Sequence, residues 1–130
     1  MLTTLGKRQW TQNAHNIINA TRDLARAVND IPGIKVIGNA EELICVVAVA
    51  LDHEYWVGKQ APNIYAIGDE LSKRLGSSLN TIPDGFHLCI TNNHASNPTY
   101  LANFKKYLRE VVSTIDPKTK PVSHMGSAYF

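Results

Sequence analysis

A run of nine apolar residues, Leu43–Leu51, constrains the fold of this chain more than any other stretch of its sequence. The run is nearly continuous and rich in β-branched residues, which is typical of a central strand covered on both faces. It is far too short to cross a bilayer, because a membrane-spanning helix needs about 20 apolar residues. The sequence therefore predicts a sheet whose central strand is buried from both sides.

The residues before this run predict one long helix, a turn and a first strand. Side chains that share one helix face recur at alternating steps of three and four: Trp10, Ala14, Ile17, Thr21, Leu24, Val28 and Ile31. Pro32-Gly33 ends the helix, because proline cannot continue it and glycine adopts the turn geometry. A strand over Ile34–Ile37 and a turn over Gly38–Glu42 then lead into the central strand.

The residues after the run predict a loop, two helices and two strands. The polar and aromatic loop Asp52–Pro62 precedes Asn63, which can cap a helix that stops at Gly76. Strands are predicted over Leu79–Ile82 and Phe86–Thr91. The last helix starts at Asn97 and Pro98, an N-cap followed by a proline, and closes at Asp116-Pro117. Its apolar stripe is Leu101, Phe104, Leu108, Val111 or Val112, and Ile115.

These elements follow the order helix, two strands, helix, two strands, helix. Because consecutive strands joined by short turns pair antiparallel, the order predicts an α+β fold of two layers, with helices on one face of an antiparallel sheet. A length of 130 residues suits one domain. We therefore expect residues 1–130 to form a single unit, with residues 118–130 as a tail.

Composition and charge exclude some classes of partner. Thirteen basic and eleven acidic residues leave a net charge of +2, and the basic residues are spread along the chain, so no nucleic-acid partner is predicted. No stretch predicts a transmembrane segment, and the N-terminus lacks a signal-peptide pattern. Cys45 and Cys89 lie in apolar runs, which favours buried free thiols in a reducing compartment over a disulfide.

The polar residues form no recognisable metal or carboxylate site. None of the five histidines stands at metal-ligand spacing to another histidine or to a cysteine, so no metal is expected. The adjacent acids Glu41-Glu42 and Asp69-Glu70 point in different directions, and both pairs are interpreted as solvated.

The aromatic and basic residues outside the core are equally uninformative about catalysis. Tyr55 and Trp56 are interpreted as a lid over the core, with an exposed binding patch as the alternative. Lys73, Lys105 and Lys106 lie on predicted helices with polar neighbours, where an unperturbed amine is protonated and is no nucleophile. The residues by themselves thus predict a small α+β domain without a self-contained active site.

Several stretches, taken in order, resemble one enzyme family. They are Ile31–Asn39, Ile64–Arg74, Leu79-Asn80, His87–Thr91 with His94 three residues further on, and Met125–Tyr129. The set resembles the C-terminal domain of the sphingosine-1-phosphate lyases, in the wider group of pyridoxal-phosphate decarboxylases of fold type I. Two departures stand out. Gly76-Ser77-Ser78 replaces the family's Gly-Trp, and the loop Asp52–Pro62 is longer than the family's link.

The resemblance implies a function that this chain does not complete by itself. The family cleaves phosphorylated sphingoid bases to a fatty aldehyde and phosphoethanolamine, and its cofactor forms a Schiff base with a lysine. That lysine, and the acid that holds the pyridine nitrogen, are implied to lie upstream in a large domain. We therefore expect pyridoxal phosphate in the full-length enzyme and none on this chain alone.

The same resemblance implies the partners and the location. The chain is expected to be a fragment or one half of a split enzyme that pairs with the missing large domain, within a homodimer in the full-length form. The expected location is the cytoplasmic side, where full-length relatives are membrane-anchored by an upstream segment. With the large domain absent, Trp10, Leu2 and Leu5 are expected to lie exposed.

Two residues are predicted at the rim of the active site by the resemblance: His94, in a loop after a strand, and Tyr129, in the tail. The alternative for His94 is a loop histidine bonded to nearby backbone, and for Tyr129 it is terminal disorder. Two other functions stay open at this point. One is the small domain of an amino-acid decarboxylase, and the other is a stand-alone interaction module without catalysis.

Overall fold

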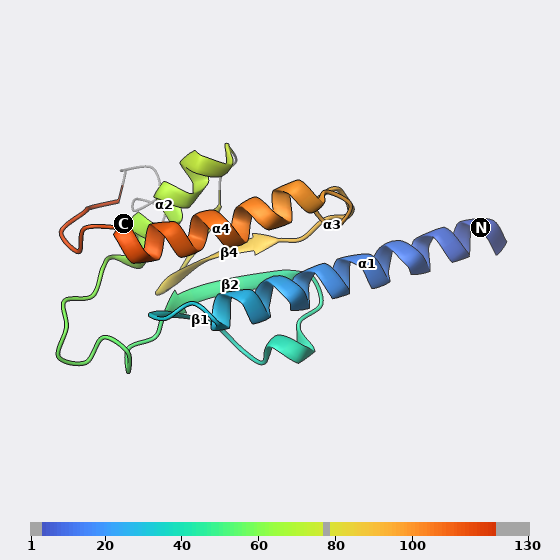
Figure 1. Cartoon of the computed structure of the whole chain (residues 1–130). Coiled ribbons are helices and arrows are strands. Elements are labelled where there is room, and N and C mark those ends of the chain that lie inside the picture. Colours follow the sequence, from blue (N-terminus) through green and yellow to red (C-terminus); the bar gives the residue numbers. More distant parts are fainter. Residues whose placement is uncertain (1–3, 77–78, 122–130) are drawn as a thin grey trace.

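The chain folds into helices and short strands in a computed structural model that describes residues 4–76 and 79–121. The first half holds the helix α1 (Thr4–Asn29), the strand β1 (Ile34–Val36), the short helix η1 (Ala40–Glu42) and the strand β2 (Val46–Leu51). The second half holds α2 (Ile64–Leu75), β3 (Asn80–Ile82), β4 (Gly85–Cys89), α3 (Asn92–Ala95) and α4 (Pro98–Thr114). Figure 1 shows these elements in place.

The described strands form one antiparallel sheet in the order β1-β2-β4-β3. β2 occupies a central place, where Val36 pairs with Val49 on one side and Val49 pairs with Phe86 on the other. Gly85 starts β4 against β2 so closely that an added Cβ would lie 2.3 Å from the Val49 carbonyl oxygen. Glycine therefore allows the two central strands to meet at this point.

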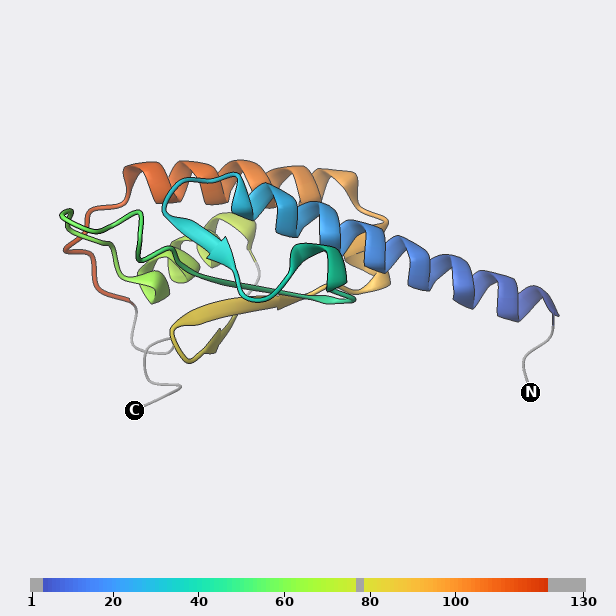
Figure 2. The same cartoon turned by 90° about the horizontal axis from the view of Figure 1, so that it is seen from below.

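The long helices α1, α2 and α4 lie on the same side of the sheet, as Figure 2 shows. Between the two layers lies a core of aliphatic and aromatic side chains, among them Leu24, Val28, Val47, Val49, Ile67, Leu71, Phe86, Phe104 and Leu108. Burial of this apolar area is the main stabilising term of such a fold. The two-layer α+β architecture, with helices on one face of an antiparallel sheet, confirms the predicted fold class.

Local signals set several of the predicted boundaries. The Asn63 side chain accepts a hydrogen bond from the Tyr65 amide, and Gly76 ends α2 in the left-handed conformation with φ of 72°. Asn97 caps α4, and Pro98 takes the first helical position. Each of these signals acts within a few residues, so the prediction did not depend on the tertiary fold.

Two predictions of secondary structure were wrong. The central strand begins at Val46 rather than Leu43, because Ile44 and Cys45 form a bend after η1. The last strand ends at Cys89, and a short helix that was not predicted, α3, follows Thr91. The Thr91 side chain caps α3, and the two residues His94 and Thr91 bond each other reciprocally as in a capping box.

The first part of α1 projects beyond the rest of the molecule, as Figures 1 and 2 both show. Trp10 begins the predicted apolar stripe, yet 68% of its surface is exposed, whereas Leu24 and Val28 on the same helix are buried. The expected exposure of Trp10 is thus confirmed. Leu2 lies outside the described residues, and the side chain of Leu5 is among those that the structure does not describe.

Candidate interface on the open face of the sheet

The two faces of the sheet have different surroundings. Residues of β2 and β4 that point toward the helices are buried, among them Val47, Val49 and Phe86. Residues of the opposite face, which we call the open face, are Lys35, Val46, Ala48, Ala50, Asn80, Ile82, His87 and Cys89. No described helix packs on this face (Figure 2). The prediction that β2 is covered on both faces was therefore wrong for the described chain.

Outside Lys35, Asn80 and His87, the open face is apolar. Val46 lies opposite Cys89 and is 37% exposed, and Ala48 lies opposite His87. At the strand ends next to it, Ile44 is 63% exposed and Ile37 is 45% exposed. Three of the six large hydrophobic side chains exposed among the described residues therefore gather at this face. Contiguous apolar surface of this kind marks a surface that contacts another protein or membrane.

Charge is depleted on the open face. In the four strands, Lys35 is the one residue among lysine, arginine, aspartate and glutamate. The core of a protein–protein interface has the same property, because a charged group loses its hydration there. The open face thus carries fewer charged residues than the helical side of the domain.

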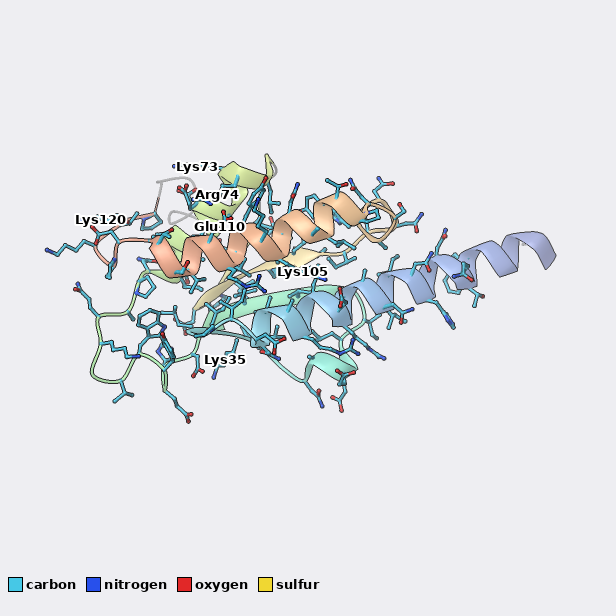
Figure 3. The ribbon with its side chains drawn as sticks, in the orientation of Figure 1. Lys35, Lys73, Arg74, Lys105, Glu110 and Lys120 are labelled. Carbon is cyan, nitrogen blue, oxygen red and sulfur yellow. The ribbon has the colours of Figure 1, made fainter. Side chains whose placement is uncertain are left out.

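The outer surface of the helices shows the opposite pattern. Arg74 bonds Glu110 across α2 and α4 at 3.0 Å, and Lys105 of α4 bonds Asp23 of α1. Figure 3 shows these charged side chains spread over the helical layer. Exposed pairs of this kind add little stability, yet they keep a surface hydrated. The outer surface of the helices is therefore a hydrated, charged surface.

An ion pair ties the connection before β2 to α1. The Arg26 guanidinium donates two hydrogen bonds to the Glu41 carboxylate, at 2.6 and 2.8 Å. The hydrogen bond from Arg26 holds the pKa of the Glu41 carboxyl below its usual value and raises the pKa of Arg26. Arg22 adds a hydrogen bond from its Nε to the Leu43 carbonyl. These bonds to α1 therefore hold the segment that precedes β2 in a fixed position.

Three sequence interpretations of polar and thiol groups need correction. Cys45 and Cys89 are free but exposed, since Cys89 lies on the open face and Cys45 lies at the bend before β2. Asp69 is buried rather than solvated, because α2 packs against both the sheet and α4, and its side chain is not without a partner. Glu41 and Glu42 are solvated as predicted.

The two predicted rim residues have different outcomes. His94 is half-buried in α3, where its Nδ1 accepts a hydrogen bond from the Thr91 amide at 3.1 Å and its ring lies 4.8 Å from that of Tyr100. The backbone bond is the contact expected of a structural histidine, and a role at the rim stays a prediction. Tyr129 and the Met125–Tyr129 stretch lie outside the described residues.

Neither a metal centre nor a membrane span is found in the part of the chain that the structure describes. No group of three His, Cys, Asp or Glu side chains converges there as a metal site requires. None of the described helices is long and apolar enough to span a bilayer.

Comparison with known proteins shows how much of the chain is similar to the lyases in sequence. No protein-family model matches the chain. Sphingosine-1-phosphate lyases from Oryza sativa subsp. japonica and Arabidopsis thaliana are each 28% identical over 124 residues, which cover 94% of this chain and 20% of the relative. A probable sphingosine-1-phosphate lyase from Legionella pneumophila is 48% identical over 61 residues, which cover 45% of this chain and 10% of the relative.

These matches confirm the predicted resemblance. The chain is similar to sphingosine-1-phosphate lyases along nearly its whole length and spans about a fifth of the length of the curated relatives from the two plants. Its two-layer α+β fold is consistent with a small domain of that enzyme.

Proposed function

We propose that this chain is the C-terminal small domain of a pyridoxal-phosphate-dependent carbon–carbon lyase. The enzyme cleaves phosphorylated sphingoid bases to a fatty aldehyde and phosphoethanolamine. The observation that carries the proposal is the similarity to lyases over 94% of this chain and only 20% of the relatives. In the proposal, the rest of the machinery lies in a part of the enzyme that this chain does not cover.

The open face gives the domain a physical role in that enzyme. An apolar face with few charges gains free energy when a second surface removes it from water, by about 25 cal/mol per Å² buried. Val46, Ala48 and Cys89 supply such a face on the side away from the helices. In the proposal, this face packs on the large domain, completes the active-site cleft and supports a homodimer.

The described lysines do not fit a cofactor site. Lys35, Lys59, Lys73, Lys106, Lys118 and Lys120 are exposed, and Lys105 is held by Asp23. Figure 3 shows Lys35, Lys73, Lys105 and Lys120 on separate parts of the molecule. An amine that forms a Schiff base is usually set in a desolvated pocket, and none of these is. The proposal therefore assigns pyridoxal phosphate, which supplies an electron sink when bound, to the large domain.

The location in the proposal is the cytoplasmic side, with any membrane anchor in an upstream segment. The exposed free thiols Cys45 and Cys89 fit a reducing compartment, where glutathione keeps such groups unpaired.

The test is reconstitution with the reading frame next to that of this chain. The two polypeptides are expressed together, and release of phosphoethanolamine from a phosphorylated sphingoid base is measured. The proposal expects a stable complex whose activity requires both parts. Decarboxylation of an amino acid instead would indicate an amino-acid decarboxylase, and a stable complex without either activity would indicate an interaction module.

A pair of substitutions tests the role of the open face in the same assay. Val46→Lys places a charge on that face, and we expect it to abolish assembly because the charge would be buried without a partner. Val57→Lys is the matched control, because Val57 is 78% exposed in the loop after β2. Equal assembly of both variants would contradict the proposed role of the face.

A further inference from the structure

The loop between β2 and α2 is fixed in place by one tryptophan. Trp56 is partly buried, and its Nε1 donates a hydrogen bond to the Gly33 carbonyl at 2.9 Å, which also accepts from the Asp52 amide. The ring packs so closely on Gly33 that an added Cβ would lie 2.8 Å from it. Trp56 thus fixes the loop on the Gly33 backbone, while Tyr55 beside it remains exposed, and their role as a lid over the core stays a prediction.

Beside this tryptophan lies a groove of about 300 Å³, between the loop and the end of α4. Its apolar surface comes from Ile31, Pro32 and Val112, and its aromatic wall comes from Tyr55 and Trp56. The two rings contact each other edge to face, with centroids 4.9 Å apart. Figure 1 shows the loop and the C-terminal end of α4 at the same end of the molecule.

Arg109 lies at the edge of the groove, and it also lines a neighbouring hollow that contains Asp23. The structure gives Arg22 a carbonyl and gives Arg26 and Arg74 carboxylates as partners. For Arg109 it gives neither a hydrogen bond nor an ion pair with any described residue. No aspartate or glutamate lines the groove.

A second positive charge lies at the aromatic wall. The Lys59 ammonium is 4.0 Å from the centroid of the Tyr55 ring, in a cation–π contact. The groove therefore combines an apolar floor, a wall of aromatic rings and a positive edge. Such a combination favours a ligand with an apolar body and one negative group, because guanidinium binds carboxylate and phosphate with paired hydrogen bonds.

We propose that this groove binds a compact amphiphilic anion, a ring or short alkyl chain that carries one carboxylate or phosphate. The apolar body lies against Ile31 and Trp56, and the anionic group pairs with Arg109. A volume of about 300 Å³ stands at the lower end of ligand pockets, which sets the size to a single ring or its equivalent. The groove lies on the helical side, so the proposal is independent of the open face and of the lyase activity.

Fluorescence of the protein tests this site directly. In the Trp10→Phe variant, Trp56 is the one tryptophan left, so its emission reports on the groove. Phenylacetate, phenyl phosphate and neutral benzyl alcohol are titrated with excitation at the red edge of the tryptophan band. The proposal expects saturable binding of at least one anion, and the stronger of the two identifies the preferred group.

Two charge substitutions in the same background decide the role of Arg109. Arg109→Gln is expected to weaken binding of the anion about tenfold and to leave that of benzyl alcohol unchanged. Lys106→Gln removes an exposed charge of the same helix outside the groove and is expected to leave binding within about twofold. Thermal melts check that both variants fold. Absence of saturable binding, or equal binding of the anion by Arg109→Gln and the parent, would overturn the proposal.

Discussion

The two faces of β2 are alike in sequence and unlike in the fold. Val47 and Val49, which are fully buried, lie in the core between the sheet and the helices, whereas Val46 on the opposite face is 37% exposed. Every residue of the strand is apolar. A strand that is apolar on both faces is fully buried only between two layers of structure. The described residues supply the helical layer alone. In our proposal, the other layer is the large domain of the enzyme.

The largest loss of stability is expected from a substitution on the face that the helices cover. Phe86→Ala removes a fully buried ring of β4 from the core between the sheet and the helices, and we expect it to lower the free energy of unfolding by about 3–5 kcal/mol. Urea unfolding followed by circular dichroism measures the change. His87→Ala, the next residue and on the open face, is the comparison, with an expected loss below about 1 kcal/mol. Similar losses in the two variants would mean that the faces are equally covered.

A sharper comparison uses the same substitution at neighbouring positions of β2. Val47→Ala is expected to cost about 2 kcal/mol, from two lost methyl groups and the cavity they leave. Val46→Ala is expected to cost less than about 0.5 kcal/mol in this chain, because water already reaches that side chain. The measurement is again urea unfolding, and a larger loss for Val46→Ala would count against the assignment of the faces.

A smaller effect is expected from the ion pair that leads into the open face. Because Arg26 lowers the pKa of Glu41 below its ordinary value of 4.5, the pair stabilises the fold above that value. The contribution is lost as the pH falls through the lowered pKa of the folded state. Water and salt screen this exposed pair, so the loss is smaller than the effects above.

The pH effect is measured as the difference between melting temperatures of the parent and of Glu41→Gln. We expect the parent to be slightly the more stable at pH 7 and the difference to shrink below pH 4.5. A difference that grows as the pH falls would have the wrong sign for this ion pair.

The sequence predicted the parts of the fold that depend on local chemistry. Asn63, Gly76 and Asn97 act on helix ends only a few residues away, and the apolar periods marked the three long helices. An all-apolar strand carries no alternation, so nothing in its sequence says which face the chain itself covers. That is why the exposure of Val46 and Cys89 could not be foreseen.

Sites formed by residues far apart in the sequence could not be predicted either, because no local pattern marks them. The groove brings Ile31, Trp56 and Arg109 together from three separate parts of the chain, and no local motif links them. Asp69 is buried because α2 meets both the sheet and α4, which a single helix's pattern does not reveal. His94 was predicted in a loop after the last strand but lies in the short helix α3, which depends on a capping contact with Thr91.

The most direct test of the central claim is the reactivity of Cys89 on the open face. In a Cys45→Ser background, the rate of alkylation by N-ethylmaleimide is measured for this chain alone and for its complex with the remainder of the proposed enzyme. Ala102→Cys, on the exposed surface of α4, serves as the control in a Cys45→Ser, Cys89→Ser background. Our account predicts that the complex slows alkylation of Cys89 about tenfold or more and leaves that of the control thiol on α4 unchanged. Equal rates for Cys89 in the two states would contradict the claim that the open face is an interface.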